Sequence, residues 1–455
     1  MAGVEIRRYS QDRRGQASNF LIVVAAAALT VVSDTLLLPA LILAAFVAGL
    51  TESLLVVGAV PAIGAVCWFL AQLLAAPVIA SYGRKLPWAT GATLVRAAAL
   101  ILLAYVVNRA DRVSTDELLR SVLICFAAYS FASGFAVTAG TSVFTRAVPT
   151  QHQPLFFRLA QLAAAAAAVI AGVLGARVLG SDGPGYPDNY SRLFLAAAVA
   201  AGGVVLLQLL TREPGRIPAS ARGEGIGSAG AVRGSGLPAL ADATFRRFLF
   251  FRIALGLAAI ADPFFILYAQ RELGIAATSL GWFLLALVAA RIVSAPFWAW
   301  MSRVHGTRAS LQAAGMLRVL PPLVAISLPY LIDTDLWRDR ITEPNAVPIA
   351  FALVFIAMGV ALGGLQTASF GYLVESLPAA GRAGAIGLTN LILALVSVVP
   401  IIGGLILRES GADYERLFLV GGGLALLATL ASGLLAPARA RPRRAATSWR
   451  LRRST

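Results

Sequence analysis

The sequence carries few charges for its length. Only 13% of its 455 residues are charged, whereas 58% are hydrophobic and the mean hydropathy is +0.79. A soluble domain usually has about 25% charged residues, so this composition excludes a soluble globular protein. It predicts an all-α polytopic membrane protein.

Cysteine and histidine are also scarce, which limits the possible chemistry. Cys67 and Cys125 lie in apolar stretches without metal-ligand spacing, so we interpret them as small buried hydrophobic residues. His152 and His305 fall between the predicted spans, which excludes a histidine proton relay inside the membrane. The sequence has no zinc signature, nucleotide-binding loop or serine elbow. We therefore expect no enzyme activity, no metal and no cofactor.

What the sequence does contain is a set of long apolar stretches. Twelve of them can cross a bilayer as helices: 19–48, 53–80, 87–107, 118–146, 155–179, 191–211, 247–270, 278–302, 309–332, 346–375, 381–407 and 415–435. A polar, Gly-rich stretch after the sixth predicts a flexible linker between two six-helix bundles. The predicted organisation is an N-terminal segment, a bundle, the linker, a second bundle and a basic tail: 1–18, 19–211, 212–246, 247–435 and 436–455.

The distribution of basic residues predicts the orientation of these spans. Of 38 Lys and Arg residues, 24 fall on the side of the two termini and 10 on the opposite side. Excess basic residues mark the cytoplasmic side of a membrane protein. We therefore expect a multi-pass protein of the cell membrane with both termini in the cytoplasm. The same rule accounts for the net charge of +16 without a nucleic-acid partner.

Two aspartates occupy matching positions in the two predicted bundles. Asp34 lies 14 residues after Phe20 in the first span, and Asp262 lies 14 residues after Phe248 in the seventh. An acid at mid-membrane costs about 2.5–3.5 kcal/mol on insertion scales, so it is expected to face protein or water and to have a function. The alternative is that each aspartate only caps or pairs locally. Pro263 follows Asp262 directly and predicts a kink.

Other features recur in the same order in both halves. Ala71–Pro77 in the second span corresponds to Ala290–Pro296 in the eighth, and each is followed by a short basic loop. Arg96 and Arg318 each lie about nine residues into the third span of their half. The recurrence predicts twelve transmembrane helices arranged as two pseudo-symmetric six-helix bundles.

Six plus six spans, a central linker and a basic loop after the second span resemble the major facilitator superfamily. The signature loop of that family reads Gly-x3-Asp-(Arg/Lys)-x-Gly-Arg-(Arg/Lys). This chain matches only its end, at Gly83, Arg84 and Lys85, and has Ala76 and Ala80 in place of the family's Gly and Asp. The resemblance implies alternating access and a functional monomer, and the missing Asp implies altered chemistry at the cytoplasmic gate.

The polar residues at membrane depth are the candidate site. Arg291 is expected either to pair with Asp262 or to bind an anionic group, whereas Arg96, Arg318 and Arg252 are expected to pack or to reach the membrane surface. Four uncharged residues either line the space between the halves or bond across helices: Thr30, Gln161, Gln366 and Asn390. The candidate cytoplasmic gate residues are Arg84, Lys85, Arg308, Glu375 and Arg382.

Glu375 is expected to pair with Arg303 or Arg308 and to hold the second half shut on that side. The hypothesis that follows is a secondary active transporter for a small amphipathic or hydrophobic molecule, working by proton-coupled efflux through Asp34 and Asp262. The coupling ion could be one other than the proton. The alternatives are a proton-coupled or facilitated uptake permease, and a non-transporting membrane helper with the same fold.

Overall fold

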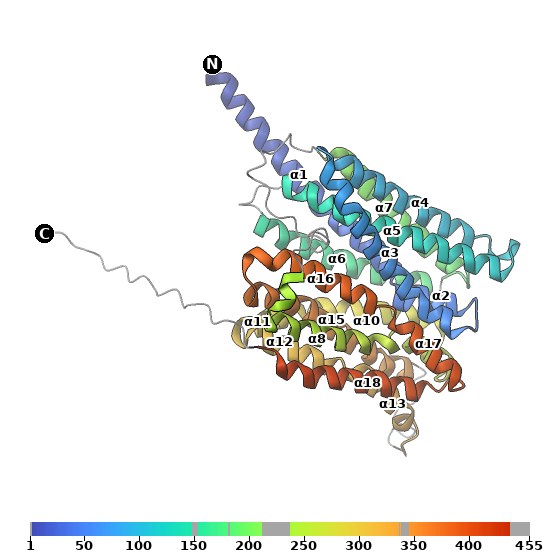
Figure 1. The fold of residues 1–455 in the computed structure, drawn as a ribbon. Coiled ribbons are helices and arrows are strands. Elements are labelled where there is room, and N and C mark those ends of the chain that lie inside the picture. The colour runs from blue at the N-terminus through green and yellow to red at the C-terminus, as the bar shows by residue number, and fades with distance from the viewer. Residues whose placement is uncertain are drawn as a thin grey trace.

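The computed structural model describes the chain as long helices joined by short connections (Figure 1). The described residues are 2–147, 153–180, 183–211, 237–335, 337 and 345–436. Within these ranges no strand occurs. A helix satisfies its backbone hydrogen bonds internally, as a lipid environment requires. His152, most of the predicted linker and nearly all of the predicted basic tail lie outside the described residues.

The first half contains six spans of membrane length. The first span consists of α1 (Ala2–Leu36), a π-helical turn (Pro39–Leu43) and α2 (Ala44–Ala48). The other five are single helices: α3 (Leu54–Ser81), α4 (Leu86–Val107), α5 (Thr115–Ala147), α6 (Gln153–Leu179) and α7 (Asp188–Leu210).

The second half contains six more spans, four of which are interrupted. They are α8 (Ala243–Leu257) with α9 (Phe264–Arg271), α10 (Leu280–Val293) with α11 (Ala295–Val304), α12 (Gly306–Leu317) with α13 (Leu320–Ile332), α15 (Ala346–Ser376), α16 (Ala379–Val396) with α17 (Val399–Glu409), and α18 (Tyr414–Ala431). The described residues thus form twelve helical spans long and apolar enough to cross a membrane. Their bounds agree with the predicted spans to within a few residues, so the fold class is confirmed.

The two halves repeat the same packing scheme. In the first half α1 packs on α6 and α7, α3 packs on α5, and α4 packs on α5 and α7. The counterparts do the same in the second half: α8 packs on α16 and α18, α10 on α15, and α12 and α13 on α15 and α18. In Figure 1 the first half lies above the second. This recurrence is the pseudo-symmetry that the sequence predicts.

Proline interrupts the first span of each half close to an aspartate. In the seventh span α8 ends at Leu257, a 3₁₀ turn follows over Ala258–Ala261, and α9 begins after Pro263. In the first span α1 ends at Leu36, just before Pro39. Proline lacks the N–H that would continue the helix, and its ring clashes with the preceding turn. The predicted break at Pro263 is therefore present.

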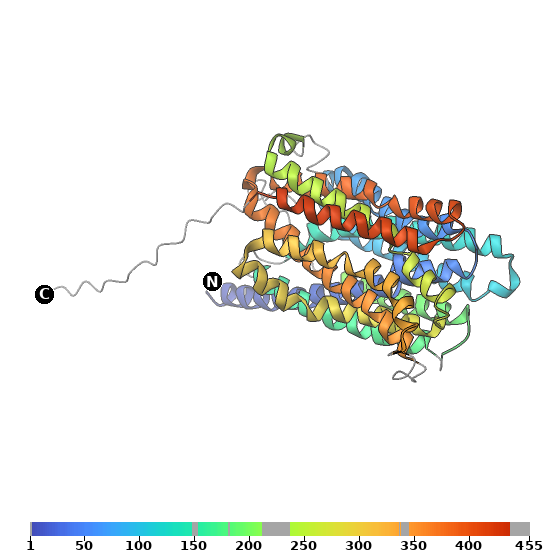
Figure 2. The ribbon, with the colours of Figure 1, turned by 90° about the horizontal axis from the view of Figure 1, so that it is seen from below.

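The halves meet most closely at one end of the bundle, which we call the distal end and which carries residues 49–53. The opposite, terminal end carries the start of α1, as Figure 2 shows from another side. At the distal end α3 packs on α17, and α6 packs on α10. A side chain on Gly58 would overlap the carbonyl of Pro400, and one on Gly281 would overlap the backbone of Ala176. Glycine at these positions lets the two backbones approach.

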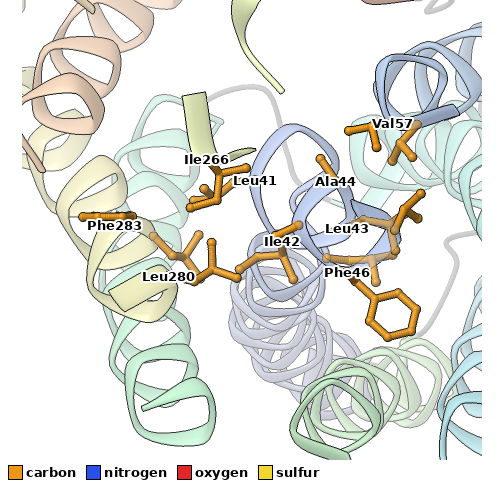
Figure 3. Close-up of a cluster of buried hydrophobic side chains, with 14 of the residues drawn as sticks. Leu41, Ile42, Leu43, Ala44, Phe46, Val57, Ile266, Leu280 and Phe283 are labelled. Atoms are coloured by element: carbon orange, nitrogen blue, oxygen red, sulfur yellow. The ribbon is translucent and has the colours of Figure 1, made fainter. Parts of the chain in front are cut away.

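The buried apolar side chains show the same difference between the two ends. At the distal end a single cluster contains residues of both halves, including Phe46 and Val57 from the first and Ile266 and Phe283 from the second (Figure 3). Two smaller clusters belong to one half each: one contains Ala75 and Val143 of the first half, the other Phe248, Trp298 and Tyr372 of the second. Within the described ranges, the halves therefore share an apolar core at the distal end and not at the terminal end.

Candidate functional site

Asp34 is held by two residues from two other helices of the first half. Arg96 on α4 donates to the Asp34 carboxylate at 2.9 Å, and the hydroxyl of Tyr129 on α5 donates to the same oxygen at 2.5 Å. Arg96 also approaches the Tyr129 hydroxyl at 3.4 Å, and its guanidinium carbon lies 5.2 Å from the centre of the Tyr129 ring. The three side chains form one charged, hydrogen-bonded group, which we call the Asp34 triad.

Exposure differs strongly within the Asp34 triad. The side chain of Arg96 is only 4% exposed, whereas that of Asp34 is 53% exposed. Asp34 lies about 140° around α1 from the exposed Leu21, at 100° per residue. A carboxylate is costly against lipid, so the open side of Asp34 faces the protein interior. Asp34 is thus an interior acid whose charge is balanced by a buried arginine and which remains accessible.

The second half contains a corresponding ion pair. Arg318, at the end of α12, forms a short ion pair with Asp262, and the two side chains are 5% and 17% exposed. Asp262 lies just before the start of α9, and Arg318 lies just after the end of α12. A helix N-terminus favours a negative charge and a C-terminus a positive one. The two helix breaks therefore favour this pair beyond its direct attraction.

These pairs correct two expectations from the sequence. Of the two alternatives for Arg291, pairing with Asp262 is wrong, because Arg318 occupies that position. The prediction that Arg96 and Arg318 only pack or reach the surface is also wrong, because both are buried and paired with aspartates. Their matched depth, about nine residues into equivalent spans, was the available signal. Tyr129 was missed, although a tyrosine in the middle of an apolar span is itself unusual.

Arg291 makes a different contact. It lies on α10 and donates a short hydrogen bond to the side-chain oxygen of Gln366 on α15. Arg291 is exposed, and among the described residues it has no carboxylate partner. Gln366, expected between the halves, is exposed beside it. The structure therefore brings these two predicted residues together and keeps them apart from Asp262.

The other uncharged candidates do not join either ion pair directly through their side chains. The Thr30 hydroxyl donates to Ala26 in its own helix at 2.8 Å, while its backbone carbonyl accepts from Arg96 at 3.4 Å. Gln161 is exposed on α6, and Asn390 is half-buried on α16. Of the four uncharged candidates, Thr30 thus contributes its backbone to the Asp34 triad.

The predicted gate residues make mostly local contacts. The predicted pairing of Glu375 is wrong, because Glu375 accepts from Thr307 at 2.7 Å, whereas Arg308 donates to the carbonyl of Gly433 at 3.0 Å. Arg303 donates back to its own helix. Arg382 donates to two carbonyls at the end of the tenth span. In the basic loop of the first half one residue is exposed and the next buried: Arg84 and Lys85.

No three His, Cys, Asp or Glu side chains gather as a metal site in the described part of the chain. Four charged groups at membrane depth instead form two ion pairs, and Arg291 forms a hydrogen bond, whereas the Nε atom of Arg252 has no hydrogen-bond partner. Their arrangement suits the binding and release of a proton or a small molecule between two bundles.

Comparison with known proteins relates the second half of the chain to a family. Residues 248–454 match the sequence model of the Major Facilitator Superfamily. The matched residues are those of the second half, whose sequence is therefore similar to this superfamily. No curated protein sequence matches the chain.

Solved structures of three transporters match nearly the whole chain in fold. A D-xylose-proton symporter matches with a TM-score of 0.67, 12% identity and coverage of 92% of this chain and 98% of that one. The nucleoside transporter NupG matches with a TM-score of 0.62, 13% identity and coverage of 92% and 98%. A bacterial homologue of the iron transporter ferroportin in an inward-facing state matches with a TM-score of 0.60 and 14% identity. This match covers 93% of this chain and 99% of that one. At these identities the likeness concerns the fold. The chain is thus a multi-pass membrane protein with the fold of secondary transporters.

Proposed function

We propose that the protein is a secondary transporter of the major facilitator superfamily that moves a small amphipathic molecule out of the cell in exchange for protons. In this mechanism the two bundles rock about a site near mid-membrane, and the site is exposed to one side at a time. The N- and C-termini lie in the cytoplasm, which the asymmetry of the basic residues supports.

The Asp34 triad carries the proposal of proton coupling. A proton carrier must be reachable and must change its contacts when it binds the proton. The Asp34 carboxylate is half-exposed and has Arg96 and Tyr129 as donors. Protonation removes the negative charge that attracts Arg96, so it loosens the contacts between α1, α4 and α5. In this way proton binding can change the conformation of the first bundle.

The conformational part of the proposal is supported by the distal contacts. The distal end is closed by a shared apolar cluster and by close backbone contacts between α3 and α17. The terminal end has separate clusters for the two halves. With the termini in the cytoplasm, this state is accessible from the inside and closed to the outside. It is the state in which an exporter receives its substrate.

The choice of an amphipathic substrate rests on charge balance. Asp34 and Asp262 are each neutralised by an arginine of their own half. Little net charge is therefore contributed by these residues to the region between the bundles. A molecule with a large apolar part suits such surroundings better than a strongly hydrated solute.

Proton movement in proteoliposomes tests the proposal. The purified protein is reconstituted with an internal pH dye, and pooled amphipathic compounds are added to wild type, Asp34→Asn and Glu409→Gln. Glu409 is a control because it is an exposed acid at the end of α17, paired with the adjacent Arg408. We expect compound-dependent proton movement in wild type and Glu409→Gln, and none in Asp34→Asn. Equal movement in Asp34→Asn would contradict the coupling role.

A further inference from the structure

The second half contains an arginine at mid-membrane that is not neutralised by an acid. Asp34 and Asp262 are both occupied by Arg96 and Arg318. Arg291 is left with the neutral side chain of Gln366 as its hydrogen-bond partner among the described residues. A cation at this depth is costly to keep. Its presence without a counter-charge indicates that something else supplies the negative charge.

The position of Arg291 on α10 shows where that charge would come from. Arg291 continues the stripe Leu280, Leu284 and Leu287, which are buried and repeat at helical spacing. Leu284 lies against Gly175 of the first half, whereas Leu287 and Arg291 lie beside α15 of their own half. The stripe therefore lies between α15 and the other bundle. Trp282 is 62% exposed and lies about 180° around the helix from Arg291 at 100° per residue.

The exposed side of Arg291 therefore faces the first half. The stripe is buried between the bundles as far as Leu287 and becomes exposed at Arg291. The guanidinium consequently lies where the halves cease to touch. A molecule that enters between them from the terminal end would meet Arg291 before the closed distal contacts.

A second arginine without an acidic partner among the described residues lies on helix α8 of the same half. The Nε atom of Arg252 is buried and has no hydrogen-bond partner. Arg252 lies one turn before Gly256, which packs against Val396 and Leu393 of α16. Because α8 and α16 run in the same direction, Asn390 lies at a similar depth to Arg252 on the adjacent helix. Arg252 thus adds a second positive charge to the bundle that carries Arg291.

We propose that Arg291 binds the anionic group of the transported molecule, with Gln366 positioning the guanidinium and Arg252 adding to the positive potential. The substrate class is then an amphipathic organic anion: an apolar body with one carboxylate. A guanidinium recognises a carboxylate with two parallel hydrogen bonds. This inference rests on the proposed transport function, since it names the chemical class of the substrate.

Binding of three probes with one apolar body tests the inference. The probes are 2-naphthoate, the neutral 2-naphthamide and the cationic 2-naphthylmethylammonium, titrated calorimetrically into the protein in lipid nanodiscs. We expect 2-naphthoate to bind most tightly, and Arg291→Gln to weaken its binding about tenfold or more, as expected for a lost charged hydrogen bond. Arg291→Lys should retain part of the preference for 2-naphthoate over the neutral and cationic probes. Arg192→Gln, which changes an exposed arginine on α7, should leave the preference for 2-naphthoate unchanged.

Three results would overturn the inference: no binding of 2-naphthoate to wild type, equal binding of the amide, or unchanged binding to Arg291→Gln. Failure of the transport proposal can be distinguished from failure of the anion site. If 2-naphthoate binds through Arg291 but moves no protons in liposomes, the anion site stands and the transport proposal fails. If the cationic probe drives proton movement in wild type and in Arg291→Gln, the transport proposal stands and the anion site fails.

Thermal stability without any ligand gives an independent readout. A residue kept for substrate binding is expected to add little stability, or to reduce it, when the substrate is absent. We expect Arg291→Gln to melt at or above the wild-type temperature, and Arg318→Gln to melt clearly below it. A loss of stability in Arg291→Gln as large as that in Arg318→Gln would make Arg291 a structural residue and overturn the inference.

Discussion

Arg318 and Asp262 join the ninth and seventh spans at the two points where both helices are interrupted. Each side chain is mostly buried, so water cannot replace the charge of the partner if that partner is removed. Removal of one member of a buried pair leaves the other charge uncompensated and typically costs about 3–5 kcal/mol. This pair should therefore contribute strongly to the stability of the second bundle.

Arg318→Gln should lower the melting temperature of the protein in nanodiscs markedly. The double variant Asp262→Asn with Arg318→Gln should be more stable than Arg318→Gln alone, because no unpaired charge remains. Arg416→Gln is the control, since its pair with Asp413 is exposed and worth about 0–1 kcal/mol. Equal melting temperatures of the single and double variants would contradict the assigned pairing.

Tyr129→Phe should slow transport without unfolding the first bundle. The variant keeps the aromatic ring beside Arg96 but removes the hydroxyl that donates to Asp34 at 2.5 Å. Loss of a hydrogen bond to a charged group costs about 1.5–3 kcal/mol. We expect initial proton flux below wild type and above Asp34→Asn in proteoliposomes. Tyr105→Phe, which changes an exposed tyrosine of α4, is the matched control and should behave as wild type.

Replacement of Arg96 separates charge from shape in the Asp34 triad. Lysine keeps the positive charge but lacks the flat guanidinium that lies over Tyr129. The melting temperature of Arg96→Lys should therefore lie between those of wild type and Arg96→Gln. An Arg96→Lys protein as unstable as Arg96→Gln would show that geometry, and not charge, holds the triad together.

Gly58→Leu should force the distal end apart. Any side chain at this position overlaps the carbonyl of Pro400, so α3 and α17 must separate to accommodate it. Spin labels at Ser53 and Ser410, in a background without Cys67 and Cys125, report the separation by electron spin resonance. We expect longer distances in Gly58→Leu. Gly423→Leu is the control, because a side chain there meets open space, and an unchanged distance in both variants would contradict the close contact.

The twelve spans were predictable because length and hydropathy alone define a helix that crosses a bilayer. The two aspartates and the break at Pro263 were predictable because each is anomalous in an apolar run. The partners of the two aspartates in these ion pairs were harder to predict from the sequence. Arg96 lies 62 residues from Asp34 and Arg318 lies 56 from Asp262, and pairing depends on how each helix is rotated.

Rotation of a helix in its bundle is set by packing, which hydropathy does not encode. This is why the sequence offers Arg291 as one alternative partner of Asp262, although Arg318 is the actual partner. The matched depth of Arg96 and Arg318 in equivalent spans was the better guide. A polar pair that recurs at the same place in both halves is more informative than proximity along the chain.

The apolar cluster shared by the halves has a consequence for temperature. Opening the distal end exposes to water the part of this cluster where the two halves meet. Exposure of apolar surface raises the heat capacity, and its free-energy cost falls on cooling. Cold should therefore increase the fraction of molecules that are open at the distal end, even when no substrate is present.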